Sequence, residues 1–100
     1  MGISKFNFGD PMSTKKERDL RQAACHAQRG LCIHCHRRMN KPTVEHLIAK
    51  RDGGKSTRAN IAAACWGCNH ARHADRRYSG LSASEFGWVR MLEAEAGLLA

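Results

Sequence analysis

Long apolar runs are absent from this 100-residue sequence. No stretch approaches the roughly 18 consecutive apolar residues of a membrane-spanning helix, and residues 1–12 lack the apolar run of a secretory signal peptide. The N-terminal myristoylation pattern is also missing, because Phe6 stands where serine or threonine is required. These absences predict a soluble protein with no membrane partner.

Aromatic residues are scarce, six in all, and the chain is long enough for one small domain only. A domain of this size buries a limited core and commonly relies on a metal or on disulfides for stability. Five cysteines are an odd number, and nothing in the sequence indicates secretion. We therefore expect reduced thiols that bind a metal in a reducing compartment.

Acidic residues are outnumbered, and the formal net charge is +8. The excess is uneven, since residues 1–80 hold sixteen Lys and Arg against six Asp and Glu, whereas residues 81–100 hold one Arg against three Glu. A basic body with a mildly acidic C-terminal segment fits a phosphate-backbone partner. A basic surface kept for solubility is the alternative explanation.

Capping boxes and hydrophobic periodicity define the expected elements. A capping box at 14–17 opens a helix over about 14–29, which Gly30 can close. The β-branched run 43–48 predicts a strand, residues 49–59 a charged loop, and residues 60–62 a second short strand. Helices follow at about 65–77 and, after a second capping box, at 82–98. The sequence thus predicts a flexible arm over 1–13 and one α+β domain over 14–100.

Two cysteine pairs form the strongest motif, Cys32-x2-Cys35 and Cys65-x2-Cys68. Four thiolates complete a closed tetrahedral zinc site, so this zinc is expected to be structural, and the neighbouring histidines 34 and 36 are left out of it. The 29 residues between the pairs exceed the roughly 15 to 20 of a simple zinc ribbon, which indicates a substantial insert. Unpaired buried thiols are the alternative. Cys25, outside the pairs, is expected to be a small buried residue.

A second metal site is expected within and just after this insert. Asn69 and His73 are spaced i, i+4 and share one face of a helix. Glu45 from the strand could complete a mixed site that suits Mg²⁺ or Mn²⁺ and tolerates Zn²⁺ or Ni²⁺. His46 would point to the other side of a regularly paired strand. His70 competes as a ligand, because it lies i, i+3 from His73.

These motifs resemble, in order and in spacing, the zinc-bearing ββα-metal type of HNH endonuclease. The resemblance covers about residues 30–77 and rests on Cys32-x2-Cys35, Val44-Glu45-His46-Leu47, Gly53-Gly54, Asn60-Ile61 and Ala64-Cys65-x2-Cys68-Asn69. It implies a ββα-metal core stapled by a four-cysteine zinc and flanked by an N-terminal and a C-terminal helix. Close relatives of this layout are small phage- or prophage-encoded nucleases. The resemblance therefore also implies the cytoplasm of a bacterial host, with phage packaging proteins as candidate partners.

The resemblance implies a metal-dependent DNA endonuclease or nickase and a role for each motif residue. His46 matches the general base, and Asn60 matches the asparagine that orients the base or braces its loop. Glu45, Asn69 and His73 match the ligands of an ion that stabilises the pentavalent phosphorus and the leaving 3′ oxygen, giving 5′-phosphate and 3′-hydroxyl ends. Glu45 stands where Asp is commoner and Asn69 where His is common, and the latter favours Mg²⁺ or Mn²⁺.

Basic side chains near the motif are candidates for gripping the phosphates beside the scissile bond. They are Lys50, Arg51, Lys55, Arg58, Arg72, Arg76 and Arg77. Double-stranded DNA is the expected substrate, with single-stranded DNA and RNA left open. The last helix can cover the core or join a homodimer, and the oligomeric state would decide between nicking and double-strand cutting.

Two further alternatives stay open at this point. Trp66 is expected to pack on the zinc knuckle, with base stacking as its other role. A four-cysteine zinc module that binds DNA without cutting it is the rival function. Its binding would need none of the Glu, His and Asn groups of the motif.

Overall fold

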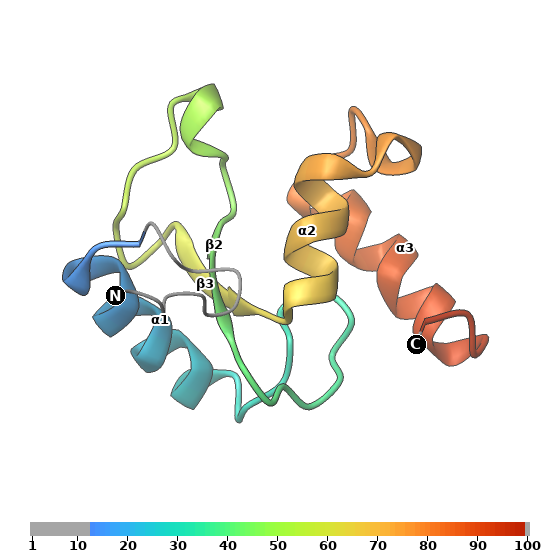
Figure 1. Ribbon diagram of the computed structural model, residues 1–100, viewed down its shortest axis with the longest axis horizontal. Coiled ribbons are helices and arrows are strands. Elements are labelled where there is room, and N and C mark those ends of the chain that lie inside the picture. Colours follow the sequence, from blue (N-terminus) through green and yellow to red (C-terminus); the bar gives the residue numbers. More distant parts are fainter. Residues whose placement is uncertain (1–12, 100) are drawn as a thin grey trace, which may run out of the picture.

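The computed structural model describes residues 13–99 and confirms the expected α+β class. In chain order the elements are α1 (Lys15–Ala27), β2 (Thr43–His46), the 3-10 helix η1 (Lys50–Asp52), β3 (Ile61–Ala64), α2 (Trp66–Ala74), the 3-10 helix η2 (Arg76–Tyr78) and α3 (Ala83–Glu95). The strands lie between α1 and α2, with α3 beyond α2 (Figure 1). Apart from residue 13, the expected N-terminal arm lies outside the described residues.

The two strands form an antiparallel ribbon whose register is regular from Thr43 opposite Ala64 to His46 opposite Ile61. Successive side chains of a strand point to opposite faces, so Glu45 and His46 leave β2 on different sides. All four residues of β3 are buried, and three of them are alanines, which let the covering segments approach closely. The ribbon therefore presents Glu45 toward α2 and His46 toward α1.

α1 begins after the N-cap Thr14, and the expected capping box is present. The Glu17 amide donates to Thr14 Oγ1 at 3.1 Å, and Glu17 Oε1 accepts from the Thr14 amide at 3.0 Å. At the other end, Gln28 donates to the carbonyl of Ala63 at 2.8 Å and accepts from its amide at 3.0 Å, as a neighbouring strand would. Cys25 is only half-buried, less than expected.

α2 is shorter than the sequence predicts and ends at Ala74. The Asp75 carboxylate accepts from the Arg77 amide and opens η2, so Arg76 and Arg77 leave the axis of α2. At its start, the Cys65 sulfur accepts from the Cys68 amide at 3.4 Å, which makes this cysteine the N-cap of the helix. One residue thus serves both the helix end and the thiol cluster.

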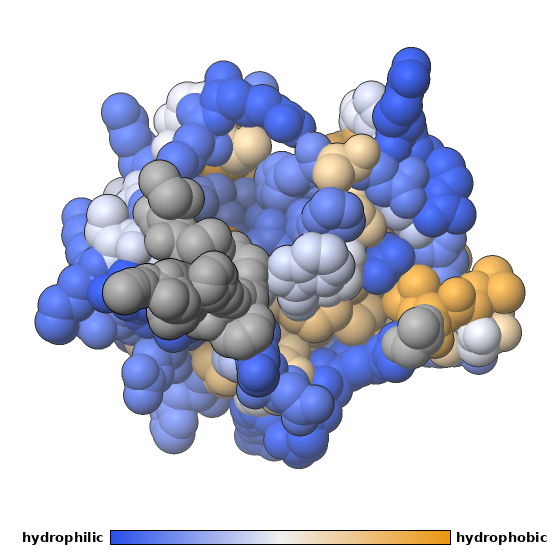
Figure 2. All heavy atoms as spheres, in the orientation of Figure 1, coloured by the Kyte–Doolittle hydropathy of each residue, from blue (hydrophilic) through white to orange (hydrophobic). Residues whose placement is uncertain are grey.

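α3 covers the core, one of the two roles expected for it. Phe86 is fully buried and meets the rings of His34 and Tyr78 edge-on, with centroids 4.9 and 5.0 Å away. The expected apolar stripe is less buried than predicted, since Leu92 is 50% exposed. Most of the face in Figure 2 is hydrophilic, and its most hydrophobic patch lies over the C-terminal end of α3. Between residues 13 and 99, no helix combines the length and the apolar character needed to cross a membrane.

Candidate metal centre and active site

The four paired cysteines converge, with their sulfur atoms all within 4.8 Å of one another. A tetrahedral zinc with Zn–S bonds of about 2.3 Å places its sulfurs about 3.8 Å apart, so the cluster fits this ion. Cys32, Cys35 and Cys68 are buried and Cys65 is half-buried, all as free thiols. In the described part of the chain, no other group of three or more His, Cys, Asp or Glu side chains converges in this way.

Backbone amides stabilise negative charge at these sulfurs. Cys32 Sγ accepts from the amides of His34 and Cys65, each at 3.4 Å. Hydrogen bonds with the Cys65 and Cys68 thiols hold the pKa of Cys32 well below its usual range. In turn, the hydrogen bond with Cys32 raises the pKa of Cys65 to about 11. A bound cation removes these hydrogen bonds between thiols, because each coordinated thiol is deprotonated outright.

Arg90 connects α3 to the cluster, a contact that the sequence motifs do not predict. Its Nε donates to Cys68 Sγ at 3.2 Å and its Nη1 to the Tyr78 hydroxyl at 3.2 Å, with the residue 9% exposed. The Tyr78 hydroxyl donates to Glu93 at 2.8 Å. A guanidinium beside a thiolate partly neutralises a four-thiolate site, whose net charge with zinc is negative.

Glu45 is completely buried and has a partner on each carboxylate oxygen. Oε1 lies 3.0 Å from His73 Nε2, and Oε2 lies 2.7 Å from His34 Nε2 and 3.3 Å from Arg72 Nη1. Burial raises the pKa of Glu45, but the hydrogen bonds from His34 and His73 and the Arg72 charge outweigh it and lower the pKa to about 2. The carboxylate is therefore anionic. His34 is not among the residues expected at either metal site, and its position between two cysteines is the one sequence signal for its role.

Two of the three expected metal ligands meet. Glu45 and His73 are in contact across β2 and α2, close enough to approach one ion, and the His73 side chain is 30% exposed. Asn69 instead uses its amide nitrogen to donate to Thr43 Oγ1 at 2.8 Å and to the Val44 carbonyl at 2.9 Å. Its carbonyl oxygen is the atom left for a metal. The competing candidate His70 stacks on the Trp66 ring rather than joining Glu45.

His46 lies on the other side of β2, in a small polar network. Its Nε2 is 3.0 Å from Ser56 Oγ and 3.5 Å from Glu17 Oε2, and its side chain is 11% exposed. The Ser56 hydroxyl donates to Glu17, so its oxygen is left to accept from the His46 Nε2–H. This arrangement leaves the His46 lone pair on Nδ1. Burial lowers the pKa of His46, which keeps the ring neutral near pH 7.

Glu17 was assigned only to the capping box, yet it is a centre of this network. The carboxylate is 3% exposed, accepts from Ser56, and pairs with Lys50 Nζ at 3.1 Å. The Ser56 hydrogen bond, opposed by burial, lowers the pKa of Glu17 to about 2. The N-terminal helix thus places a fixed negative charge beside His46.

Asn60 closes the loop that follows β2. Its carbonyl accepts from the Ile48 amide at 2.8 Å, and its amide nitrogen donates to the carbonyls of Ile48 at 3.0 Å and Lys55 at 2.9 Å. Gly54 packs against the same backbone segment at Ile48, where an added Cβ would lie 1.6 Å from the Ile48 carbonyl oxygen. Of the two roles that the resemblance implies for Asn60, this geometry matches the loop brace.

The basic residues expected at the phosphates fall into two groups, those already held by hydrogen bonds or ion pairs and an open group. Arg72 donates to the carbonyls of His46 at 2.9 Å and Leu47 at 2.6 Å and forms an ion pair with Glu45, and its side chain is 10% exposed. Lys50 pairs with Glu17, and Arg77 pairs with Asp75 at 2.7 Å. The open group is exposed and forms no side-chain hydrogen bond or ion pair within residues 13–99; its members are Arg51, Lys55, Arg58 and Arg76.

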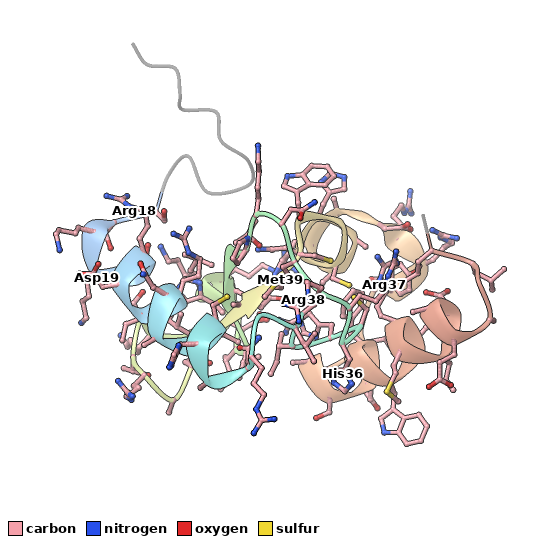
Figure 3. All side chains as sticks on the ribbon, turned by 90° about the horizontal axis from the view of Figure 1, so that it is seen from below. Arg18, Asp19, His36, Arg37, Arg38 and Met39 are labelled. Carbon is pink, nitrogen blue, oxygen red and sulfur yellow. The ribbon has the colours of Figure 1, made fainter. Side chains whose placement is uncertain are left out.

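A polar hollow of about 460 Å³ lies beside the Glu45–His73 contact. His73, Arg51, Arg72 and Arg76 are among the residues that line it, and they come from η1, α2 and η2. A second basic edge lies on the turn of the first knuckle, where His36, Arg37 and Arg38 lie between α1 and α3 (Figure 3). The carboxylates of Asp52, Asp75 and Glu85 also line the hollow, so arginines and acidic groups both lie near His73, the more exposed member of the candidate metal pair.

The HNH endonuclease family model matches residues 32–75. No curated protein and no solved structure matches the chain. The matched segment contains both cysteine pairs, the ribbon and α2, and it ends two residues after His73. Residues 32–75 thus match the HNH endonuclease family model, and four of their cysteines are positioned to bind a metal.

Proposed function

We propose that this protein is a metal-dependent DNA endonuclease or nickase that hydrolyses phosphodiester bonds. The contact between Glu45 and His73 carries the proposal, because it unites a carboxylate and an imidazole inside the matched segment and beside a polar hollow. A module that only binds DNA has no need for a histidine that reaches the Glu45 carboxylate from the lining of this hollow. The zinc in the four-cysteine site keeps a structural role.

Glu45 and His73 hold the catalytic ion, with the Asn69 carbonyl oxygen as the third proposed ligand. This donor set suits Mg²⁺ or Mn²⁺ and accommodates Zn²⁺ or Ni²⁺. Bound there, a divalent ion stabilises negative charge on the phosphoryl oxygens and on the leaving 3′ oxygen. Asn69 also fastens α2 to β2, which keeps Glu45 and His73 at their contact distance.

His46 acts as the general base. Its neutral ring accepts a proton from the attacking water at Nδ1, while Nε2–H stays with Ser56. Glu17 then stabilises the imidazolium that forms, since its carboxylate lies 3.5 Å from the ring. Asn60 holds the loop that carries Ser56 and so keeps this partner in place.

The open basic group makes the phosphate contacts in this proposal, and Arg72 positions Glu45 and the end of β2 instead. Lys50 and Arg77 can join the open group by releasing their carboxylate partners. One active site cuts one strand, so a single chain nicks and paired chains cut both strands of a duplex. The free thiols suit the reducing cytoplasm of a bacterial host, where phage packaging proteins are the proposed partners.

Conversion of supercoiled plasmid by the zinc-loaded protein tests the proposal. With added Mg²⁺ or Mn²⁺ we expect nicked or linear product, and His46→Ala is expected to lower the rate by about 10²- to 10⁴-fold. His26→Ala, an exposed histidine of α1, serves as the matched control and is expected to cut like the parent. Undiminished cutting by both His46→Ala and His73→Ala would contradict the assignment. Retardation of DNA without cutting under Mg²⁺, Mn²⁺, Zn²⁺ and Ni²⁺ would favour the non-catalytic zinc DNA-binding module.

A further inference from the structure

An exposed aromatic pair lies on the helix that carries His73. The rings of Trp66 and His70 stack with centroids 4.5 Å apart and planes 10° apart. Trp66 remains 50% exposed, and His70 is exposed as well. Half of the Trp66 surface is therefore open to solvent, so the helix presents an exposed indole beside the knuckle.

The pair is aligned with the proposed catalytic site. Trp66, His70 and His73 recur at i, i+4 and i+7, so they lie along one side of α2. At a rise of about 1.5 Å per residue, Trp66 lies about 10 Å along the axis from His73, roughly three nucleotide steps of 3.4 Å. A strand that reaches His73 with one phosphate can thus place a base a few nucleotides away at Trp66.

The platform is held in place before any ligand arrives. Trp66 follows Cys65 directly, and the thiol cluster anchors this end of α2 through Cys65 and Cys68. Across residues 13–99, His70 is the one ring that contacts the indole. A rigid π-face in a chain of net charge +8 suits a polyanion with flat bases better than an apolar protein surface.

We propose that Trp66 and His70 form a stacking platform for an unpaired nucleobase, so that the preferred DNA carries a single-stranded segment beside the cut. Bases within a duplex are already stacked on each other and offer no free face to a side chain, whereas unpaired bases stack on aromatic rings with little sequence preference. The placement beside the cut rests on the proposed function, but the stacking itself does not.

Fluorescence provides the test, because the chain has two tryptophans and the second, Trp88, lies 63% exposed on α3. In a Trp88→Phe variant, Trp66 is the sole reporter. We expect an oligothymidylate to quench its emission, and a duplex of equal phosphate content to leave it nearly unchanged. The zinc-loaded protein is used without added catalytic metal, so that the DNA is not cut.

Affinity measurements supply the matched variants. Trp66→Ala is expected to weaken oligothymidylate binding by roughly five- to 150-fold, the equivalent of one lost base stack. Duplex binding should change less than about twofold by the same reasoning. Trp66→Phe should retain most of the affinity, and Trp88→Ala all of it. Circular dichroism and zinc content check that each variant is folded.

Each outcome separates this inference from the proposed function. Loss of oligothymidylate affinity in Trp66→Ala supports the platform even if the parent fails to cut plasmid. Equal affinity of Trp66→Ala and parent, or equal quenching by single strand and duplex, overturns the platform even if cutting is confirmed. Should Trp66→Ala not fold, quenching of the Trp88→Phe variant decides the matter, since it keeps Trp66.

Discussion

His34 Nε2 lies 2.7 Å from Glu45 Oε2, and these side chains are 2% and 1% exposed. The contact joins the first cysteine knuckle to β2, with the Phe86 ring of α3 edge-on behind the imidazole. The thiol cluster and the buried carboxylate are therefore parts of one connected structure. A disturbance of the knuckle moves His34, and Glu45 with it.

Removal of the structural metal should unfold the domain. Zinc binding at such sites contributes about 10–16 kcal/mol to folding in zinc-finger peptides, more than the stability of a small domain. We expect Cys68→Ser to lose the metal and the cooperative thermal transition, measured by elemental analysis and circular dichroism. Cys25→Ser is the control, since Cys25 lies outside the cluster. A cooperative transition in Cys68→Ser at the parent temperature would refute a structural role for the metal.

Loss of His34 should destabilise the fold. His34→Ala removes the shortest hydrogen bond to the buried Glu45 carboxylate, which keeps His73 and Arg72 as partners, so the free energy of unfolding is expected to fall by about 1–3 kcal/mol in urea titrations. The exposed His36 on the same turn supplies the control. His36→Asn is the suitable change, because asparagine tolerates the φ of 62° found there. If His34→Ala lowered the free energy of unfolding as little as His36→Asn does, the contact between His34 and Glu45 would add little to stability.

Acid should destabilise the protein in a window set by two carboxylates. The pKa of Glu17 and that of Glu45 both fall from 4.5 to about 2 on folding. A pKa lowered by folding adds stability that is present above the unfolded value and is lost as the pH falls, here from about 4.5 toward 2. Thermal melts of Glu17→Gln should depend less on pH in this window, because glutamine can keep the capping box but does not titrate. Glu95→Gln, at the exposed end of α3, serves as the control and should show the same dependence of melting temperature on pH as the parent. If Glu17→Gln also showed the parent's dependence on pH, the prediction would be contradicted.

Substitution of Arg72 should affect the stability of the fold, whereas substitution of Arg76 should affect DNA binding. Arg72→Ala should lower the free energy of unfolding by about 3–5 kcal/mol, because it removes the ion pair with the buried Glu45 and the hydrogen bonds to two backbone carbonyls. Arg76→Ala should leave stability unchanged and reduce the slope of log affinity against log salt by about one. Urea titration and DNA binding at several salt concentrations distinguish these effects. A normal stability of Arg72→Ala would return that residue to the phosphate contacts.

Interactions between residues close in sequence were predictable from the sequence alone. Both capping boxes, at Thr14–Glu17 and Ser82–Glu85, formed as expected, because their partners are three residues apart and need no tertiary contact. The cysteine spacing indicated the metal cluster because zinc tolerates few ligand sets. The ribbon and the helices followed from hydrophobic periodicity, with errors of a few residues at their ends.

Tertiary packing decided which distant side chains became partners. His34 met Glu45, Arg90 met Cys68, and Arg72 turned inward, because the faces that α2 and α3 present depend on how they dock against the ribbon and the knuckle. Glu17 became a neighbour of His46 only once α1 lay across β2. A buried charge must find its opposite charge or hydrogen-bond donor wherever the fold places it, and local periodicity carries no information about that position.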